Sequence, residues 1–407
     1  MSVCPGKQAA ALRLLEEMNR IDSTTKDKDG VQAVQMIVQR ELEAMGFAVR
    51  RVPSPTADSA DLLVAEFEGE SSGQLVGRDQ RFVLLVGHAD TVLSNVGTGP
   101  EGLGAFRVDH AANRAFGAGI IDDKGGLVVA LRGLRAYFDW CASEGRGPRL
   151  SLRFVCSPNE EAGSPGFTDV FRTLAADSVI ALGFEPALEN GNVVESRRGN
   201  RWYHIEVHGR AGHAGRSKGE HVNAAHELSI KIAHLHELND LSRGVSVNVG
   251  HIEGGLDAYN VICGRASCKL DTRFATFADR DRLHADIERI LQRSFVRSAD
   301  GAHGCSTTYS LADDCPPFSG SGLARPFIEC YLDCVAKVGG GTVRAERAGG
   351  AGDVNYMSDR HVSVIDGLGA VGGAMHTPGE FIDLPSLVIR SDALAEFLAR
   401  LEKMLAE

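Results

Sequence analysis

Histidine and carboxylate side chains follow several short apolar segments of this 407-residue chain. His88 and Asp90 come directly after 82–87, two positions apart, so both side chains point the same way on an extended backbone. Asp122 and Asp123 lie within the glycine-flanked stretch GAGIIDDKGG, and later apolar segments are followed by Glu160, Glu161, Glu185 and His376. Taken singly, each is most simply a polar residue at a strand end. Together they make a hard, oxygen-rich donor set without a thiolate.

Two imidazoles and three or four carboxylates suit two divalent ions, Zn(II) first, with Co(II) or Mn(II) as alternatives. Two such ions roughly 4 Å apart activate a water and polarise a carbonyl, which is hydrolytic chemistry. A carboxylate that is not a ligand can then transfer protons. The spacing alone leaves open which of Glu160 and Glu161, and which of Asp122 and Asp123, takes each role.

Alternating apolar strands and helices must position these residues. The expected strands are 62–67, 82–87, 150–156 and 179–184, and the expected helices are 12–18, 31–45 and 127–140. This order is typical of an α/β fold, here a mixed sheet sandwiched by helices. Functional groups of such sheets gather beyond the carboxyl ends of the strands, where the candidates fall.

The rhythm changes at about residue 198. The expected order becomes β-α-β-β-α-β, the ferredoxin-like α+β arrangement. The six elements are expected at 202–209, 223–238, 246–252, 267–274, 280–296 and 306–311. The α/β pattern then resumes with a helix over 323–338, a strand over 362–366 and a helix over 386–405. We therefore expect a catalytic domain made of 1–197 and 312–407, interrupted by an inserted lid and dimerisation domain at 198–311.

Composition excludes several classes of protein. The net charge of −11, with interspersed signs, argues against a nucleic-acid partner. No apolar stretch approaches the length of a membrane span, and the first 20 residues lack the apolar centre of a signal peptide. The nine cysteines include no C-x-x-C pair and are expected to be reduced thiols of a cytoplasmic protein.

The sequence motifs of other enzyme classes are either absent or lack the secondary structure that they require. GLGAVG (367–372) matches a dinucleotide fingerprint, but GAMHTPGEF after it cannot open a long helix. The chain has no G-x-x-x-x-G-K-[ST] and no G-x-S-x-G. A nucleotide-dependent oxidoreductase remains a distant alternative, which would bind a cofactor tightly and no metal.

Six motifs resemble one known family. They are GHADTV (87–92), GAGIIDDKGG (117–126), SPNEEAGSPG (157–166), GFEPA (183–187), GRAGHAG (209–215) and DGLGAVGGAMH (366–376). In this order and spacing the chain resembles the co-catalytic zinc exopeptidases and N-deacylases of metallopeptidase family M20. That family includes bacterial glutamate carboxypeptidase, acetylornithine deacetylase, succinyl-diaminopimelate desuccinylase and aminoacylase. The motif style, including Thr25-Lys26-Asp27, favours the glutamate carboxypeptidase branch.

The resemblance implies a role for each candidate. Asp122 would bridge two Zn(II) ions, His88 and Glu185 would complete one, and Glu161 and His376 the other. Glu160 would be the general base for the attacking water, and Asp90 the partner of His88. The family also implies a cis peptide bond between Asp122 and Asp123, which would turn the second carboxylate away from the ions.

The inserted domain would contribute further residues. The resemblance makes His213 an oxyanion donor, often in the active site of the other subunit of a homodimer, and Asn260 and Arg273 substrate-binding residues. Arg273 would bind a free carboxylate of a small peptide or N-acyl amino acid. The role of Asp353 stays open.

The implied reaction is carboxypeptidase-type release of a C-terminal amino acid, with N-acyl-amino-acid deacylation as the alternative. Segment 189–193 lacks a basic residue for a second substrate carboxylate, which argues against a strict glutamate preference. A non-catalytic protein of the same fold should have lost a ligand or the base, and this chain retains them all.

Overall fold

The protein is described by a computed structural model covering residues 4–70, 82–95, 105–319, 322–358 and 362–406. The chain divides into two compact units. Unit 1 comprises Met1–Ser196, Ser319–Ala348 and Gly352–Glu407, and unit 2 comprises Arg197–Phe318 and Gly349–Ala351. The predicted fold class, an α/β layer with an inserted α+β layer, is confirmed.

Unit 1 is built on a six-stranded mixed sheet of order β1-β2-β6-β3-β7-β17. Strands β6, β3, β7 and β17 run parallel, and β2 runs antiparallel to both of its neighbours. Every residue of β3 and β6 is buried, as expected of parallel strands covered on both faces. The strand bounds are Ala48–Val52 (β1), Leu62–Phe67 (β2), Phe82–His88 (β3), Ser151–Ser157 (β6), Ser178–Gly183 (β7) and Ser363–Ile365 (β17).

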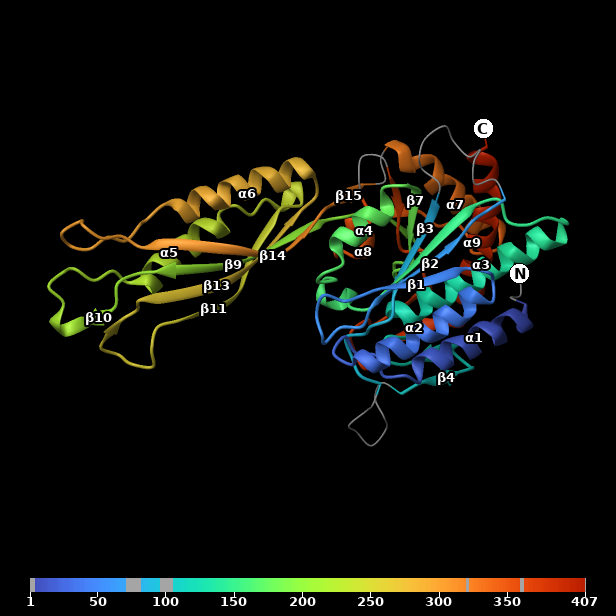
Figure 1. Ribbon diagram of the computed structural model, residues 1–407, viewed down its shortest axis with the longest axis horizontal. Coiled ribbons are helices and arrows are strands. Elements are labelled where there is room, and N and C mark those ends of the chain that lie inside the picture. The colour runs from blue at the N-terminus through green and yellow to red at the C-terminus, as the bar shows by residue number, and fades with distance from the viewer. Residues whose placement is uncertain (1–3, 71–81, 96–104, 320–321, 359–361, 407) are drawn as a thin grey trace. The chain divides into compact units, whose positions relative to one another are not determined.

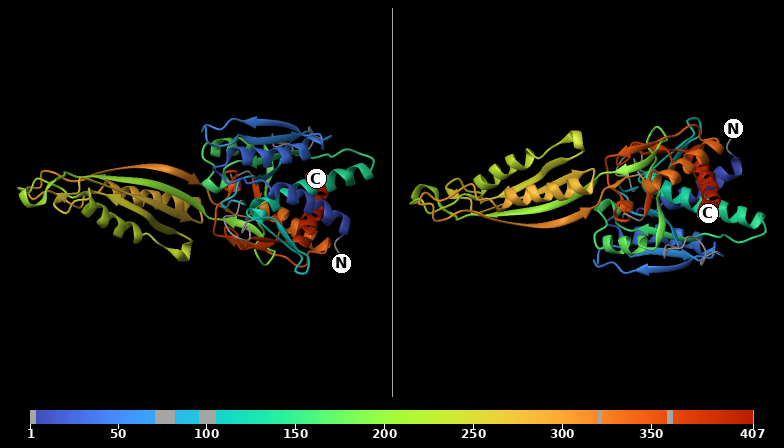
Figure 2. Two further views of the ribbon diagram at one scale, coloured as in Figure 1. Left: turned by 90° about the horizontal axis from the view of Figure 1, so that it is seen from below. Right: turned by 90° about the horizontal axis from the view of Figure 1, so that it is seen from above.

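Helices cover both faces of this sheet (Figures 1 and 2). Three of them, α1, α7 and α9, begin with a proline in the first turn, where no backbone hydrogen bond is lost. The helices are α1 (Pro5–Asn19), α2 (Lys28–Glu43), α3 (Gly126–Ser143), α4 (Thr168–Ala175), α7 (Arg325–Lys337), α8 (Asp353–Tyr356) and α9 (Leu384–Met404).

Two small sheets lie outside the six-stranded sheet. One has the order β18-β19-β5-β4 and pairs Phe381 with Phe116, so segments from opposite halves of the chain lie side by side. The other has the order β15-β8-β16. Their strands are β4 (Arg107–Asp109), β5 (Arg114–Phe116), β8 (Val193–Arg197), β15 (Phe318–Ser319), β16 (Ala345–Ala348), β18 (Gly372–Gly373) and β19 (Phe381–Asp383).

Unit 2 has the β-α-β-β-α-β order expected from the sequence. Its antiparallel sheet has the order β11-β13-β9-β14, and two helices cover one face (Figure 1). The elements are β9 (Gly199–His208), α5 (Ala224–His236), β11 (Ser246–Gly254), β13 (Arg265–Phe274), α6 (Phe277–Gln292) and β14 (Ser306–Cys315), with a small two-stranded sheet of β10 (Gly212–His213) and β12 (Val261–Ile262).

A buried ion pair joins the two helices of unit 2. Lys231 and Glu227 on α5 lie 3.1 Å apart, and neither side chain is exposed. The Lys231 ammonium donates to the carbonyls of Ile290 and Leu291, at the C-terminal end of α6, where helix carbonyls lack backbone partners. Glu227 accepts hydrogen bonds from the following backbone N–H groups. The pair therefore terminates α6 and fixes the chain beyond it.

Within the described parts of the chain, no helix is both long enough and apolar enough to cross a membrane.

Candidate metal centre

His88 ends β3 at the carboxyl edge of the unit 1 sheet, and its side chain is almost fully buried. Its Nδ1 lies 3.0 Å from the backbone carbonyl of Asp90 and 3.3 Å from the Asp90 carboxylate. A carbonyl can only accept, so Nδ1 carries a proton, and Nε2 on the other side of the ring is the nitrogen that could bind a metal ion. The predicted pairing of Asp90 with His88 is present in the structure.

Asp122 lies between the two predicted histidines. Its Oδ1 is 3.0 Å from His88 Nε2 and its Oδ2 is 3.3 Å from His376 Nε2. His376 comes from the loop between β18 and β19, and its Nε2 also lies 3.2 Å from Glu161. The two carboxylate oxygens of one residue thus face two different imidazoles, which is the arrangement that a bridging ligand requires.

The peptide bond between Asp122 and Asp123 is cis, as predicted. Asp123 points to the other side of the backbone, where its Oδ2 accepts a hydrogen bond of 3.2 Å from the His88 backbone N–H. A Cβ at Gly126 would lie only 1.9 Å from Asp123 Oδ1. The glycines of the motif therefore make room for the second carboxylate, which supports the strand end instead of facing the histidines.

Glu160 and Glu161 form a short helical turn, Glu160–Ala162, just after β6. Both of their backbone N–H groups donate to the Asp90 carboxylate, at 3.0 and 3.2 Å. Asp90 also accepts a hydrogen bond of 2.7 Å from Thr25. Asp90 therefore supports both His88 and the turn that carries the two glutamates, which its position in the sequence did not indicate.

Glu185 follows β7, and its Oε1 lies 3.8 Å from His88 Nε2. Two sets of ligand atoms cluster closely enough to hold an ion: one is His88, Asp122 and Glu161, and the other is His88, Glu160 and Glu185. All of the predicted unit 1 residues thus converge at one edge of the sheet. Glu160 shares a cluster with Glu185, so proximity alone does not separate the base from the ligands.

Close packing of charges shifts the pKa values of this constellation. Burial would lower the pKa of His88, but hydrogen bonds to Asp122 and Asp90 raise it well above its usual value. The hydrogen bond to Asp122 raises the pKa of His376 to about 9. Burial raises the pKa of Glu161 to about 7, and it raises the pKa of Glu160 well above the usual range. These shifts are those of carboxylates crowded together without enough positive charge, a deficit that cations would correct.

One buried atom gives a direct test of the fit to metal ions. Glu161 Oε1 is buried and accepts no hydrogen bond of good geometry from the described residues, although His376 Nε2 is 3.2 Å away. A buried carboxylate oxygen without a donor is costly, and a cation would satisfy it. The donors are imidazole nitrogens and carboxylate oxygens, which Zn(II), Co(II) and Mn(II) accept. The residues present therefore fit a divalent pair.

Sequence reasoning missed Ser164 and Glu380, which support the constellation, and left the role of Asp353 open. Ser164 donates a hydrogen bond of 2.5 Å to Asp353, and Ser164 closes the turn that carries Glu160 through a bond to the Asn159 carbonyl. Burial raises the pKa of Asp353 to about 6. Glu380 accepts hydrogen bonds from the backbone of the Asp122 loop. The only sign of Glu380 in the sequence was an acid four residues after His376, in a segment without a helical pattern.

In unit 2, two of the predicted residues contact one another. The side-chain amide of Asn260 lies 3.3 Å from His213 Nε2, and Gly215 donates its backbone N–H to His213 Nδ1 at 3.2 Å. If Nδ1 accepts from Gly215, the proton of the neutral ring is on Nε2, and the Asn260 amide must then face the ring with its oxygen instead of its nitrogen. The side chain of His213 is exposed.

Arg273 lies in the four-stranded sheet of unit 2, at the end of β13 away from the small β10–β12 sheet that carries His213. It pairs with Asn200 near the start of β9, whereas Arg265, at the opposite end of β13, pairs with His208. At about 3.3 Å per residue, Arg273 is roughly 26 Å along the strand from Arg265, beyond which His213 and Asn260 lie. The Arg273 guanidinium is oriented by Asp271, 3.0 Å from its Nε.

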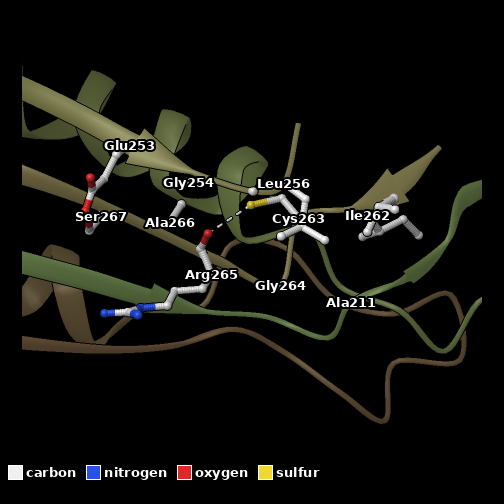
Figure 3. A pocket seen from close by; sticks show the side chains of 12 residues that line it. Ala211, Glu253, Gly254, Leu256, Ile262, Cys263, Gly264, Arg265, Ala266 and Ser267 are labelled. Atoms are coloured by element: carbon white, nitrogen blue, oxygen red, sulfur yellow. Dashed lines mark hydrogen bonds between the residues drawn. The ribbon is translucent and has the colours of Figure 1, made fainter. Parts of the chain in front are cut away.

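A cavity of about 610 Å³ in unit 2 flanks the His213 strand (Figure 3). Its lining includes Ala211, Leu256 and Ile262 together with Glu253 and Arg265. None of the candidate metal ligands lines it. The cavity is therefore distinct from the metal constellation of unit 1.

The glycines of GLGAVG have a packing role. A Cβ at Gly369 would lie 2.3 Å from the Phe184 carbonyl, and one at Gly372 would lie 2.0 Å from the Phe381 carbonyl. The segment leads into β18 instead of a helix, so it lacks the helix N-terminus that binds a pyrophosphate. These glycines bring the His376 loop close to the strand end that carries Glu185.

Comparisons with known proteins agree with this geometry. Residues 196–298 match the M20_dimer family, a peptidase dimerisation domain. Carboxypeptidase G2 from Pseudomonas sp. (strain RS-16) is 26% identical over 383 residues, covering 94% of this chain and 86% of that protein. Succinyl-diaminopimelate desuccinylase from Gluconacetobacter diazotrophicus is 25% identical over 408 residues, covering 96% and 97%.

Solved structures share the fold. YXEP from Bacillus subtilis, described as a dinuclear metal binding peptidase from the M20 family, superimposes with a TM-score of 0.67 at 15% identity, over 98% of this chain and 99% of that one. This likeness shows the fold, and the carboxylate–histidine constellation is a candidate metal site. The predicted resemblance to the M20 metallopeptidases and deacylases is confirmed: the chain carries their dimerisation domain and is homologous to a carboxypeptidase and to desuccinylases.

Proposed function

We propose that this protein hydrolyses an amide bond next to a free carboxylate, releasing a C-terminal amino acid from a small peptide or related substrate. The observation that carries the proposal is the position of Asp122, with each carboxylate oxygen facing one of two histidines. His88 and Glu185 would hold one divalent ion and Glu161 and His376 the other, with Zn(II) as the expected metal. When bound, the ions would lower the pKa of the nucleophilic water and polarise the scissile carbonyl.

Glu160 is the proposed general base. It would take a proton from the attacking water and return it to the leaving amine. Burial, with the nearby charge of Glu185, raises the pKa of Glu160, which suits a group that must hold and release a proton. The support of its backbone N–H by Asp90 would fix the carboxylate relative to His88.

His213 is the proposed donor to the oxyanion that forms on the substrate carbonyl. With Nδ1 accepting from Gly215 and the Asn260 amide turned to place its oxygen toward the ring, the neutral imidazole would carry its proton on Nε2 for this purpose. Asn260, in contact with the same ring, would bind substrate beside it. Arg273, oriented by Asp271, would bind the substrate carboxylate through its planar fork.

The separation of these groups within unit 2 favours a dimeric active site. A small substrate cannot touch Arg273 and His213 of the same copy across roughly 26 Å of strand. We therefore propose that the protein is a homodimer through unit 2 and that His213 and Asn260 complete the active site of the partner. The matched dimerisation domain supports this assembly.

A substrate screen tests the proposed reaction. The metal-loaded protein is incubated with dipeptides, with N-acyl amino acids and with matched C-terminal amides, and the released amine is identified. Cleavage of free-carboxylate substrates but not of their amides supports the proposal. Efficient cleavage of the amides contradicts it, and activity confined to N-acyl amino acids favours the deacylase, as the desuccinylase homologues would suggest.

A further inference from the structure

Glu380 is a buried acid that links two parts of the candidate centre. It comes four residues after His376, directly before β19, and is 2% exposed. Its Oε2 accepts a hydrogen bond from the Gly119 N–H at 2.9 Å, and its Oε1 accepts from Ile121 at 2.9 Å and from Asp122 at 3.3 Å. One carboxylate thus holds three donors within four residues of the loop that presents Asp122.

These donors have few alternatives. The loop leaves β5 and turns at Gly119, whose φ of 62° lies in the left-handed region, so its N–H groups do not enter a regular helix or strand. Buried backbone donors require partners. The loop is also tied to the Glu380 backbone, because Gly117 donates to the Glu380 carbonyl at 3.3 Å.

The charge of Glu380 has a nearby counterpart. Lys124, two residues beyond Asp122, is 1% exposed, and its ammonium donates to the Ile21 carbonyl at 2.9 Å. The ammonium interacts electrostatically with Asp22 and, more weakly, with Glu380. The Asp122 loop is therefore held between an acid on the His376 side and a base that reaches the end of α1.

The connection from Glu380 back to His376 is short and hydrogen-bonded. Thr377 donates its N–H to the Ala374 carbonyl, and Glu380 donates its own to the Thr377 carbonyl, at 3.2 and 3.1 Å. Ala374 and His376 have φ values of 57° and 60°. Residues other than glycine adopt such values only when the surrounding structure holds them there. Anchoring this turn at Glu380 is what the surroundings supply.

We propose that Glu380 is a positioning residue that sets Asp122 and His376 relative to each other, and thereby governs binding of the second ion. This inference rests on the proposed metal centre. Asp122 and His376 are two of the three ligands proposed for that ion, and both depend on Glu380. Of the ligands proposed for the first ion, His88 ends a buried strand and Glu185 follows another, so only the shared Asp122 depends on it.

The test is a Co(II) titration of the metal-free protein, followed by its visible absorption spectrum. Glu380→Gln keeps the shape but places an NH₂ group against one of the N–H donors. We expect both Co(II) ions to bind the unaltered protein, and the second to bind about 10- to 100-fold more weakly to E380Q, with an altered spectrum, as is typical when a residue supporting a ligand is lost. Glu380→Asp retains the charge at shorter reach and should recover part of the affinity.

Glu402 provides the matched control. It is a buried acid on α9 that accepts hydrogen bonds from Arg146 and from the Arg149 backbone, none of them a candidate ligand. E402Q should lower the melting temperature and leave both Co(II) affinities unchanged. Equal affinities for both ions in E380Q and the unaltered protein would overturn the role of Glu380.

The unaltered protein separates this inference from the proposed function. If it binds fewer than two ions, the metal centre itself is wrong. A measurement without any variant is amide hydrogen exchange of the metal-free protein: Gly119, Ile121 and Asp122 should be strongly protected. Rapid exchange at these three amides, in a protein that binds two ions, would overturn the anchoring by Glu380.

Discussion

The imidazole of His376 lies 3.3 Å from the carboxylate of Asp122, although the two residues come from distant parts of the chain. The pairing of β19 with β5 brings the segments together, and Glu380 joins them. In the absence of metal the two side chains form an ion pair. Any cation that enters must therefore displace a proton.

The pH dependence of metal binding follows from this pair. Asp122 raises the pKa of His376 to about 9, so the ring is protonated below that pH and competes with the ion, and the competition disappears above it. Affinity should increase with pH up to about 9, by about tenfold per unit for each proton released. Calorimetric titrations in buffers of different ionisation enthalpy measure the proton count. An affinity that does not change between pH 6.5 and 8.5 would contradict this pairing.

Adjacent glutamates offer a matched pair of variants. Glu160→Gln cannot accept a proton, so kcat should fall by about 10²- to 10⁴-fold while two ions remain bound. Glu161→Gln should instead lose metal, because its buried Oε1 is a proposed ligand atom. Metal content by inductively coupled plasma analysis, alongside kcat, distinguishes them. If E160Q loses an ion and E161Q does not, the two roles must be exchanged.

Mixing two inactive variants tests whether His213 acts across the dimer. His213→Ala and Glu160→Gln should each be nearly inactive with metals bound. In a re-equilibrated 1:1 mixture, half of the dimers are mixed, and each mixed dimer has one intact site if His213 acts in the partner, which gives about a quarter of the normal activity. If His213 serves its own subunit, the mixture stays inactive, and the dimeric site is wrong.

The buried pair of unit 2 makes a prediction about stability. Lys231→Met would leave the Glu227 carboxylate buried without its cation and free the last carbonyls of α6, costing about 3–5 kcal/mol. Urea unfolding followed by circular dichroism measures this, and the exposed Lys269→Met is the control, expected within about 0.5 kcal/mol of the original. The double variant with Glu227→Gln should recover part of the loss. Unchanged stability of K231M would show that the pair contributes nothing net.

The sequence was a good guide wherever a residue's role depends on its own strand. His88, Glu160 and Glu185 follow apolar runs that became β3, β6 and β7, and parallel strands bring their carboxyl ends to one edge. Choosing between neighbouring acids needed the family resemblance, because spacing does not reveal a cis bond. The short strands β18 and β19 were missed, since two- or three-residue strands have no periodicity to read.

Hydrogen bonds between a side chain and a backbone group far away in the chain could not be predicted from the sequence. Glu380 binds N–H groups, which every residue except proline possesses, so nothing in the sequence of the Asp122 loop marks its partner. Asp353 was noticed as an acid, but its bond to Ser164 joins segments far apart in the chain. Three-dimensional pairing decides such contacts.

The crowding around Asp123 has a consequence for how this segment can vary. A Cβ at Gly87 on β3 would lie 2.6 Å from one Asp123 oxygen, and a Cβ at Gly126 on α3 would lie 1.9 Å from the other, 2.0 Å from the Phe184 carbonyl. A side chain at Gly126 would collide with the Phe184 backbone, and one at Gly87 with the buried Asp123 and Leu127 side chains. The strand end, the loop and the first turn of α3 are thus mutationally interlocked: a larger residue at either glycine requires a compensating change in the groups that it meets.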